Sequence, residues 1–451
     1  MGPGLPVRVH FRARRDWQFV PPRPLKPWMP PMLRSGAPRL ARALLVACGA
    51  LLAIGASGVG ATASETPDTP ATMGFVAGDA KPDVAGAVAV PGGWMVPYAE
   101  KIAGTDVTFR MVPIPGGTFR MGSPADETDR SVDEGPTFTV SVAPFWIGRC
   151  EVTWAEYKTF MAASDDFLAI EAAGLRSITP DNEADAVTSP SNLYEPDRTF
   201  MKGEDPELPA VTMTPFAARQ YTKWISGLSG RFYRLPAEGE WEYACRAGST
   251  TPWNTGADAA GLDAVAWFAD NSDDTPHKVG LKKANAWGLH DMHGNVAEWV
   301  IDELVAGGYA RQAALPQPVA VADAITWPKI LYPRIVRGGS FYDDADRCRS
   351  AARRGSRDDH GTDADPGWKY SDPNLPLSPC WYTEPPAIGV GMRVVRPFVA
   401  PPAAEQRKWW NADLECIAAD VADRLREGKG SRGLVDPKMP EDVRRARKGR
   451  R

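Results

Sequence analysis

The sequence has little net charge, few cysteines and only one long apolar run. Its formal net charge of −4 over 451 residues, with a pI near 5.9, gives no global signal for binding nucleic acid or an anionic membrane. Six cysteines are present, and Cys48 lies in a segment with the features of an export signal. Its removal would leave five, an odd number, so at least one cysteine would stay free or pair between chains.

The apolar run lies near the N-terminus, at residues 43–54. Arginines precede it, and small residues suitable for cleavage follow at 61–63. We therefore predict that residues 1–63 are an N-terminal extension with an export signal, that translation starts at Met32, and that cleavage near Ala63 releases a periplasmic or secreted protein without a membrane span. The alternative is an uncleaved anchor, but the run is interrupted by glycines and is short for a span of roughly 20 apolar residues.

Proline and glycine are abundant, with 43 and 42 residues, and they indicate a loop-rich fold. A hydrophobic content of 43% allows a large core. Composition predicts a flexible linker at 64–104, one domain at 105–398 and a basic C-terminal tail at 399–451. Apolar spacings of three and four predict a short helix at 411–425 in that tail. The proline-rich stretch 167–208 is predicted to be a surface insertion.

Local signals mark three helix starts inside the domain. Thr153 followed by Glu156 matches a capping box before an apolar stretch. Thr214 with Pro215 opens a second helix, and Pro236 starts a third. Helices among short alternating strands and long loops predict an α+β fold.

The stretch 285–299, NAWGLHDMHGNVAEW, has the densest set of candidate functional residues. Its glycines and turn-forming Asn and Asp residues predict an ordered loop. Asp291 and Glu298 with the main-chain carbonyls of Gly294 and Val296 offer the all-oxygen ligands that Ca²⁺ prefers. The alternative is that the two carboxylates pin the loop without a metal.

Six sequence blocks in order resemble the formylglycine-generating enzyme family, the sulfatase-modifying factors. The blocks are MVPIPGGTFRMGS (111–123), IGRCEVTWAEY (147–157), YRLPAEGEWEYACRAG (233–248), the 285–299 loop, RIVRGGSF (334–341) and GMRVVRP (391–397). The resemblance implies a loop-rich variant of the C-type-lectin fold. It also implies calcium at Asp291, Gly294, Val296 and Glu298.

Catalytic members of that family follow a Gly-Gly-Ser block with two cysteines, which bind copper and drive O₂-dependent oxidation of a substrate cysteine. Here the block at 338–340 is intact, and the resemblance makes Ser340 and Cys348 the candidate catalytic residues. The position of the first cysteine is Asp343, however. Because one thiolate beside a carboxylate is a poor Cu(I) site, copper is doubtful here.

A second, iron-dependent branch of the family needs a His-rich triad from an additional helical domain. This chain has five histidines and no such domain. His290 and His293 with Glu298 could hold a transition metal, but they lack helical spacing and are more often surface or supporting residues.

The resemblance also implies a disulfide. Catalytic relatives bridge the cysteine after the EWEY helix to a cysteine three residues before the Arg of an AAR strand. Cys245 matches the first position, and Cys348 lies five residues before Arg353. If the segment is a strand, a shift of two residues keeps Cys348 on the same face. We therefore predict a Cys245–Cys348 disulfide, with two buried free thiols as the alternative.

Three function classes stay open. The protein could be an exported, calcium-stabilised binding or scaffold module whose ligand is a protein or glycan, with sulfatases among the candidates. It could be an oxidase that converts a sulfatase cysteine to formylglycine. It could also perform other metal or O₂ chemistry at the loop with Ser340, Asp343 and Cys348.

Overall fold

The computed structural model describes residues 73–191, 195–356, 381–382 and 387–449, which all lie in one compact unit, Glu65–Arg451. The predicted export signal, including Ala63 and Met32, lies outside the described residues. None of the helices described is long and apolar enough to span a bilayer. Short strands and helices joined by long ordered loops confirm the predicted α+β class.

Sixteen strands form five small sheets in the described part of the chain. The strands are β1 (Phe75–Ala77), β2 (Val88–Val90), β3 (Gly93–Met95), β4 (Tyr98–Lys101), β5 (Thr108–Ile114), β6 (Gly117–Met121), β7 (Phe138–Val142), β8 (Phe145–Gly148), β9 (Ala186–Pro190), β10 (Ala297–Glu303), β11 (Val319–Ala320), β12 (Arg334–Arg337), β13 (Arg353–Gly355), β14 (Val390–Met392), β15 (Val395–Pro397) and β16 (Gly430–Leu434). The sheet orders are β1-β3-β2, β13-β12-β10-β14, β11-β7-β6, β15-β8-β5-β4 and β16-β9.

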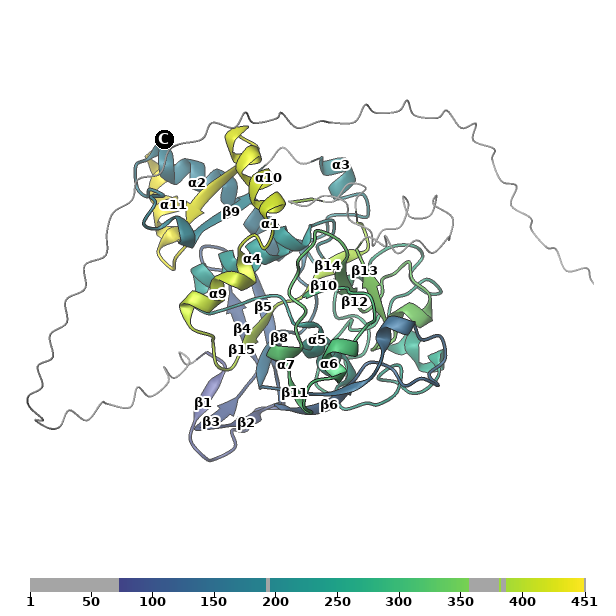
Figure 1. Cartoon of the computed structure of the whole chain (residues 1–451). Helices are drawn as coiled ribbons and strands as arrows, with labels where there is room; N and C mark the ends of the chain where they lie inside the picture. Colours follow the sequence, from purple (N-terminus) through teal and green to yellow (C-terminus); the bar gives the residue numbers. More distant parts are fainter. Residues whose placement is uncertain (1–72, 192–194, 357–380, 383–386, 450–451) are drawn as a thin grey trace, which may run out of the picture. The chain divides into compact units, whose positions relative to one another are not determined.

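The helices lie between and around these sheets (Figure 1). They are α1 (Trp154–Met161), α2 (Ala163–Ala172), α3 (Pro196–Thr199), α4 (Pro215–Ser229), α5 (Glu238–Arg246), α6 (Ala310–Ala313), α7 (Val321–Ala324), α9 (Ala403–Trp410), α10 (Glu415–Arg426) and α11 (Met439–Lys448). Short 3₁₀-helices occur at Val132–Glu134, Glu183–Asp185, Ala259–Ala264 and Ala345–Cys348.

The three predicted helix starts are present, each with a local cause. Thr153 caps α1 and forms the capping box with Glu156. Thr214 accepts a hydrogen bond from the third residue of α4, and Gly230 ends α4 in the left-handed conformation. The helix predicted from Pro236 is α5, which is buried along its whole length.

The sheet β13-β12-β10-β14 positions the predicted site, because β10 directly follows the 285–299 loop. All seven residues of β10 are buried. β12 pairs with it antiparallel and β14 parallel. This sheet lies against α4 and α5, whose apolar faces complete two large cores.

Residues 73–104 correct the predicted flexible linker. β1, β2 and β3 form a separate sheet, and β4 pairs with β5 in register from Tyr98–Met111 to Lys101–Thr108. Trp94, Met95 and Ile102 supply the large apolar side chains that a linker would lack, and Met95 and Ile102 are fully buried.

The C-terminal segment corrects two predictions together. Its predicted short helix is present as α10, but the segment is not only a solvated tail. β16 pairs with β9, which lies inside the predicted surface insertion, and α11 packs on α2 (Figure 1). Arg219 of α4 also donates to the carboxylate of Asp413 at 2.5 Å. Insertion and tail therefore cover each other's backbone and apolar surface.

Candidate functional site

The 285–299 loop begins with a turn that Asn285 closes. Its side-chain Oδ1 accepts hydrogen bonds from main-chain N–H groups two and four residues on, and its Nδ2 donates to Ala244 O at 2.8 Å. Half-buried Trp287 is held edge-on against Tyr243, with ring centroids 4.8 Å apart. The start of the loop is therefore fixed to α5, as an ordered loop requires.

The middle of the loop has residues in the left-handed region. Asp291 and Asn295 have φ of 57° and 56°, and Gly294 has 74°. A Cβ at Gly294 would lie 2.1 Å from the carbonyl oxygen of Trp267, so only glycine fits. Asn295 N donates to that same oxygen at 2.6 Å. The backbone is thus locked in the conformation that aims Asp291 inward.

Glu298, a predicted calcium ligand, is already neutralised by Arg393. The Nη2 of Arg393 donates to Oε1 at 2.7 Å, and its Nε lies within 3.1 Å of both carboxylate oxygens. Trp241 Nε1 donates to Oε2 at 2.8 Å. Because both side chains of the ion pair are buried, this is a strong and complete interaction.

Asp291 and Glu151 differ from Glu298, since each keeps one buried oxygen without a hydrogen-bond partner, Oδ1 and Oε2 respectively. Both residues are 2% exposed. Burial raises the pKa of both carboxyls, and the charge of Asp291 raises the pKa of Glu151 further. We name Glu151, Asp291 and Glu298 the carboxylate cluster.

The donor set fits a hard cation at Asp291 but not at Glu298. An orphaned, buried carboxylate oxygen is the feature that a Ca²⁺ ion would satisfy. Glu298 has its lone pairs taken by Arg393 and Trp241. Oδ1 of Asp291 therefore remains available to a cation, whereas Oε2 of Glu151 lacks a hydrogen bond but lies 4.0 Å from Nη2 of Arg393.

Ser340, one of the two predicted catalytic residues, is engaged by Asp343. Asp343 accepts from the main-chain N of Ser340 at 2.8 Å and from its Oγ at 2.7 Å, both on Oδ2. Its Oδ1 accepts from Arg354 at 2.7 Å. Asp343 therefore closes the turn after β12, and the Ser340 hydroxyl is committed to it.

Cys348 is fully buried beneath the same turn. A Cβ at Gly339 would lie 2.6 Å from its sulfur. Burial, and then the charge of Asp343, raise the pKa of the Cys348 thiol well above its usual range. With a protonated thiol and a committed carboxylate, these residues do not fit a Cu(I) site.

The predicted Cys245–Cys348 disulfide is absent, because both cysteines are free thiols. Residues Ala345–Cys348 form a 3₁₀-helix, so the alternation of a strand does not apply to Cys348. The residue facing Cys245 is Ser350, whose Oγ lies 3.6 Å from the Cys245 sulfur. Ser350 stands three residues before Arg353, which is the position at which the resemblance expects the partner cysteine.

His290 and His293, the predicted metal-binding histidines, have separate hydrogen-bond partners. His293 is buried, accepts from Asn254 N through Nε2 and lies 2.7 Å from Cys348 O through Nδ1, and burial lowers its pKa to about 4. His290 bonds to Arg149 and to Lys282 O. Within the described ranges, three or more His, Cys, Asp or Glu side chains nowhere gather into a metal cluster.

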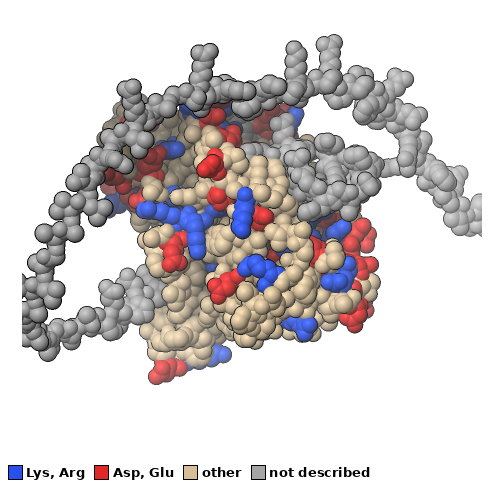
Figure 2. Space-filling view, in the orientation of Figure 1, with Lys and Arg blue, Asp and Glu red and all other residues tan. Residues whose placement is uncertain are grey.

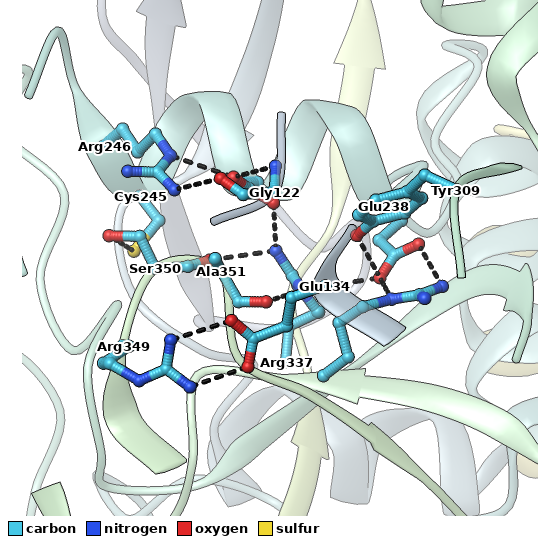
Figure 3. Close-up of polar contacts among 12 residues, drawn as sticks. Gly122, Glu134, Glu238, Cys245, Arg246, Tyr309, Arg337, Arg349, Ser350 and Ala351 are labelled. Carbon is cyan, nitrogen blue, oxygen red and sulfur yellow. Dashed lines mark hydrogen bonds and ion pairs between the residues drawn. The ribbon is translucent and has the colours of Figure 1, made fainter. Parts of the chain in front are cut away.

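Sequence reasoning missed a buried arginine–glutamate cluster next to this site (Figure 3). Arg349 forms a two-bond pair with Glu134, and Arg337 donates to Glu242 at 2.6 Å. Such pairs have no sequence spacing of their own, and only Arg246, Arg337, Glu238 and Glu242 stand in the recognised blocks. The cluster consists of Arg246, Arg337, Arg349, Arg353, Glu127, Glu134, Glu238 and Glu242.

The chain is similar to several known proteins. The chain is 28% identical over 269 residues to a formylglycine-generating enzyme of Thermomonospora curvata, covering 54% of this chain and 87% of that protein. It is 27% identical to the inactive C-alpha-formylglycine-generating enzyme 2 of Bos taurus, covering 58% and 87%. The solved structure of PvdO from Pseudomonas aeruginosa aligns with a TM-score of 0.44 and 26% identity, over 66% of this chain and all of that one. Because residues 100–365 match the family model described as the sulfatase-modifying factor enzyme 1-like domain, the chain belongs to that family.

Proposed function

We propose that this protein is a non-oxidase member of its family that acts as an exported, calcium-stabilised binding module for a protein or glycan. One observation carries the proposal: the position of the first copper-binding cysteine is Asp343, and its carboxylate closes a turn with Ser340 and Arg354. A carboxylate with both oxygens engaged cannot supply the soft ligand that Cu(I) requires.

The state of the remaining cysteine supports the same proposal. Cys348 is inaccessible to solvent, and a thiol with a strongly raised pKa is a poor metal ligand and a poor nucleophile. Relatives of similar identity have both active and inactive names, so relatedness alone does not separate the two functions. The chemistry of the loop supports the non-oxidase function. It also gives no support to another metal or O₂ reaction at Ser340, Asp343 and Cys348.

Calcium would act structurally in this proposal. It would be held by the free oxygen of Asp291 with the carbonyls of Gly294 and Val296, and it would remove the repulsion inside the carboxylate cluster. Glu298, on β10, would contribute by holding Arg393, which lies between β14 and β15, in place. The chemistry that the ion supplies is charge neutralisation.

A copper and peptide assay tests the function. Exported protein purified without a tag is given Cu(I) and a cysteine peptide of the sulfatase type under O₂, with an active formylglycine-generating enzyme as the positive control. We expect no tight copper retention and no peptide aldehyde by mass spectrometry. Formation of formylglycine at the rate of the control would overturn the non-oxidase proposal in favour of the oxidase alternative.

A further inference from the structure

Part of the 285–299 loop lines a groove. None of the residues of the predicted oxidase site, Ser340, Asp343 and Cys348, belongs to its lining. Its volume is about 1120 Å³, which exceeds the roughly 300–1,000 Å³ of ordinary small-molecule pockets. Its lining comes from Trp287 and its neighbours, from β4 and β5, and from β2 and the residues before it. We call it the β2–β4 groove.

The charge of the groove is of one sign. Arg110 and Arg149 line it, and its lining includes no Asp or Glu. Many other arginines of the described chain form ion pairs, and the buried or half-buried ones include Arg176, Arg219, Arg231, Arg234, Arg246, Arg334, Arg337, Arg349, Arg353, Arg354 and Arg393. Within the described residues, neither Arg110 nor Arg149 has a carboxylate partner. In Figure 2 the surface where β1, β2 and β3 lie is mostly uncharged, with both acidic and basic side chains at its lower end.

Arg149 is held in place for a ligand by a buried histidine. Its Nη2 lies 2.9 Å from Nε2 of His290, which is 8% exposed, and Nδ1 of His290 lies 2.8 Å from Lys282 O. Since Nδ1 donates to the carbonyl, Nε2 accepts from the guanidinium. The arginine is thereby oriented without being neutralised, and its other donors remain available.

The backbone lining the groove also has unsatisfied pairing capacity. β2 and β4 are each the edge strand of their sheet in the described chain, and both contribute residues to the lining. Edge strands present a row of N–H and C=O groups that can pair with an added strand. Trp287 and Tyr98 add aromatic surface to the same lining.

We propose that the β2–β4 groove binds an extended peptide segment of a partner protein that bears acidic side chains. The peptide pairs its main chain with an edge strand, while its carboxylates meet Arg110 and Arg149. This assignment rests on the proposed binding function and names the chemical class of its partner.

The test uses fluorescence anisotropy with the full chain and a labelled, N-acetylated nonapeptide of alternating valine and aspartate. We expect saturable binding that Arg110→Gln with Arg149→Gln weakens about tenfold or more, since charge-assisted hydrogen bonds are lost. Arg407→Gln, an exposed arginine on α9 outside the groove, is the matched control and should leave affinity unchanged. Because Arg110 is exposed, Arg110→Gln alone gives a variant whose folding is not in question.

Two altered peptides separate the proposed mode from simple charge attraction. Replacing aspartate by lysine should abolish binding, and N-methylation of alternate peptide bonds should weaken it at least tenfold, because edge-strand pairing is lost. Equal affinity for the N-methylated peptide, equal loss in the Arg407→Gln control, or arginine-dependent binding of a sulfated oligosaccharide without peptide binding would each overturn the proposal. These outcomes are independent of the oxidase assay, which alone decides the non-oxidase function.

Discussion

The two buried charge clusters of this protein differ in their balance of sign. The arginine–glutamate cluster has four guanidinium groups and four carboxylates, joined by direct ion pairs. The carboxylate cluster has three carboxylates and one contacting guanidinium, Arg393. Both lie against the same sheet, so burial alone does not explain how differently they behave.

The difference shows in the pKa of matched glutamates. Burial would raise the pKa of Glu134, but the hydrogen bonds and charge of Arg349 hold it below its usual value. Burial raises the pKa of Glu151, and the nearby Asp291 raises it further. A compensated carboxylate stabilises the fold when ionised, whereas an uncompensated one favours a proton or a cation.

Removing a charge from the arginine–glutamate cluster should have the largest effect on the free energy of unfolding. Arg337→Met removes a fully buried guanidinium that donates to Glu242 and to the carbonyls of Ser350 and Ala351. We expect a loss of about 3–5 kcal/mol in the free energy of unfolding, because buried Glu242 keeps only Arg246 as a charged partner and two buried carbonyls lose their donor. Urea unfolding measures it, with exposed Arg407→Gln as the control. A loss below about 1 kcal/mol would show that the balance of this cluster is unimportant.

The second prediction concerns Ser350, next to the arginine–glutamate cluster. Ser350→Cys places a thiol where an oxygen now lies 3.6 Å from the Cys245 sulfur. In oxidising buffer we expect the introduced thiol to form a disulfide with Cys245 that raises the free energy of unfolding by about 2–4 kcal/mol. Non-reducing peptide mapping identifies the bridge. In the parent chain Cys245 and Cys348 should be recovered as separate alkylated peptides, and finding them joined would contradict the structure.

A buried carboxylate without any arginine sharpens the comparison. Burial raises the pKa of Glu156 to about 7, despite hydrogen bonds from Thr153. With a folded pKa above the unfolded value near 4.5, the folded state binds the proton more tightly. Its contribution is therefore complete below pH 4.5 and is lost as pH rises through 7, a change of roughly 2–3 kcal/mol.

Glu156→Gln should remove that slope. The amide oxygen can still accept from Thr153, so helix α1 keeps its cap. The measurement is the free energy of unfolding from pH 4.5 to 7.5 in urea for both proteins. Identical slopes would mean that Glu156 does not bind the proton in the folded state.

The smallest expected effect concerns the carboxylate cluster. Free calcium about ten- to thirtyfold above its Kd should stabilise the protein by roughly 1–2 kcal/mol, through preferential binding to the folded state. Asp291→Ala should remove this dependence, whereas Arg407→Gln should keep it. Thermal unfolding with calcium and with chelator provides the measurement. Equal melting temperatures in the two conditions would count against the cation.

Local patterns predicted the parts of the fold that local chemistry decides. The cap at Thr153, the Pro-opened helix α4 and the ordered loop at 285–299 follow from side chains a few residues apart. The pairing of β16 with β9 was missed, because residues about 240 positions apart meet only when both segments dock on α2. Short strands rich in glycine and serine, such as β16, have little signal of their own.

For the site, too, some features followed from the sequence and others only from the tertiary structure. The sequence by itself determined the family, the α+β class and the loss of the first copper-binding cysteine, because these depend on residue identities in fixed blocks. Only the tertiary structure decided that Arg393 neutralises Glu298, that Ser350 and not Cys348 faces Cys245, and that Asp291 and Glu151 keep free oxygens. The physical reason is that charge compensation and thiol pairing act over a few ångströms in space, and the residues that supply them come from segments about 95 to 140 positions apart.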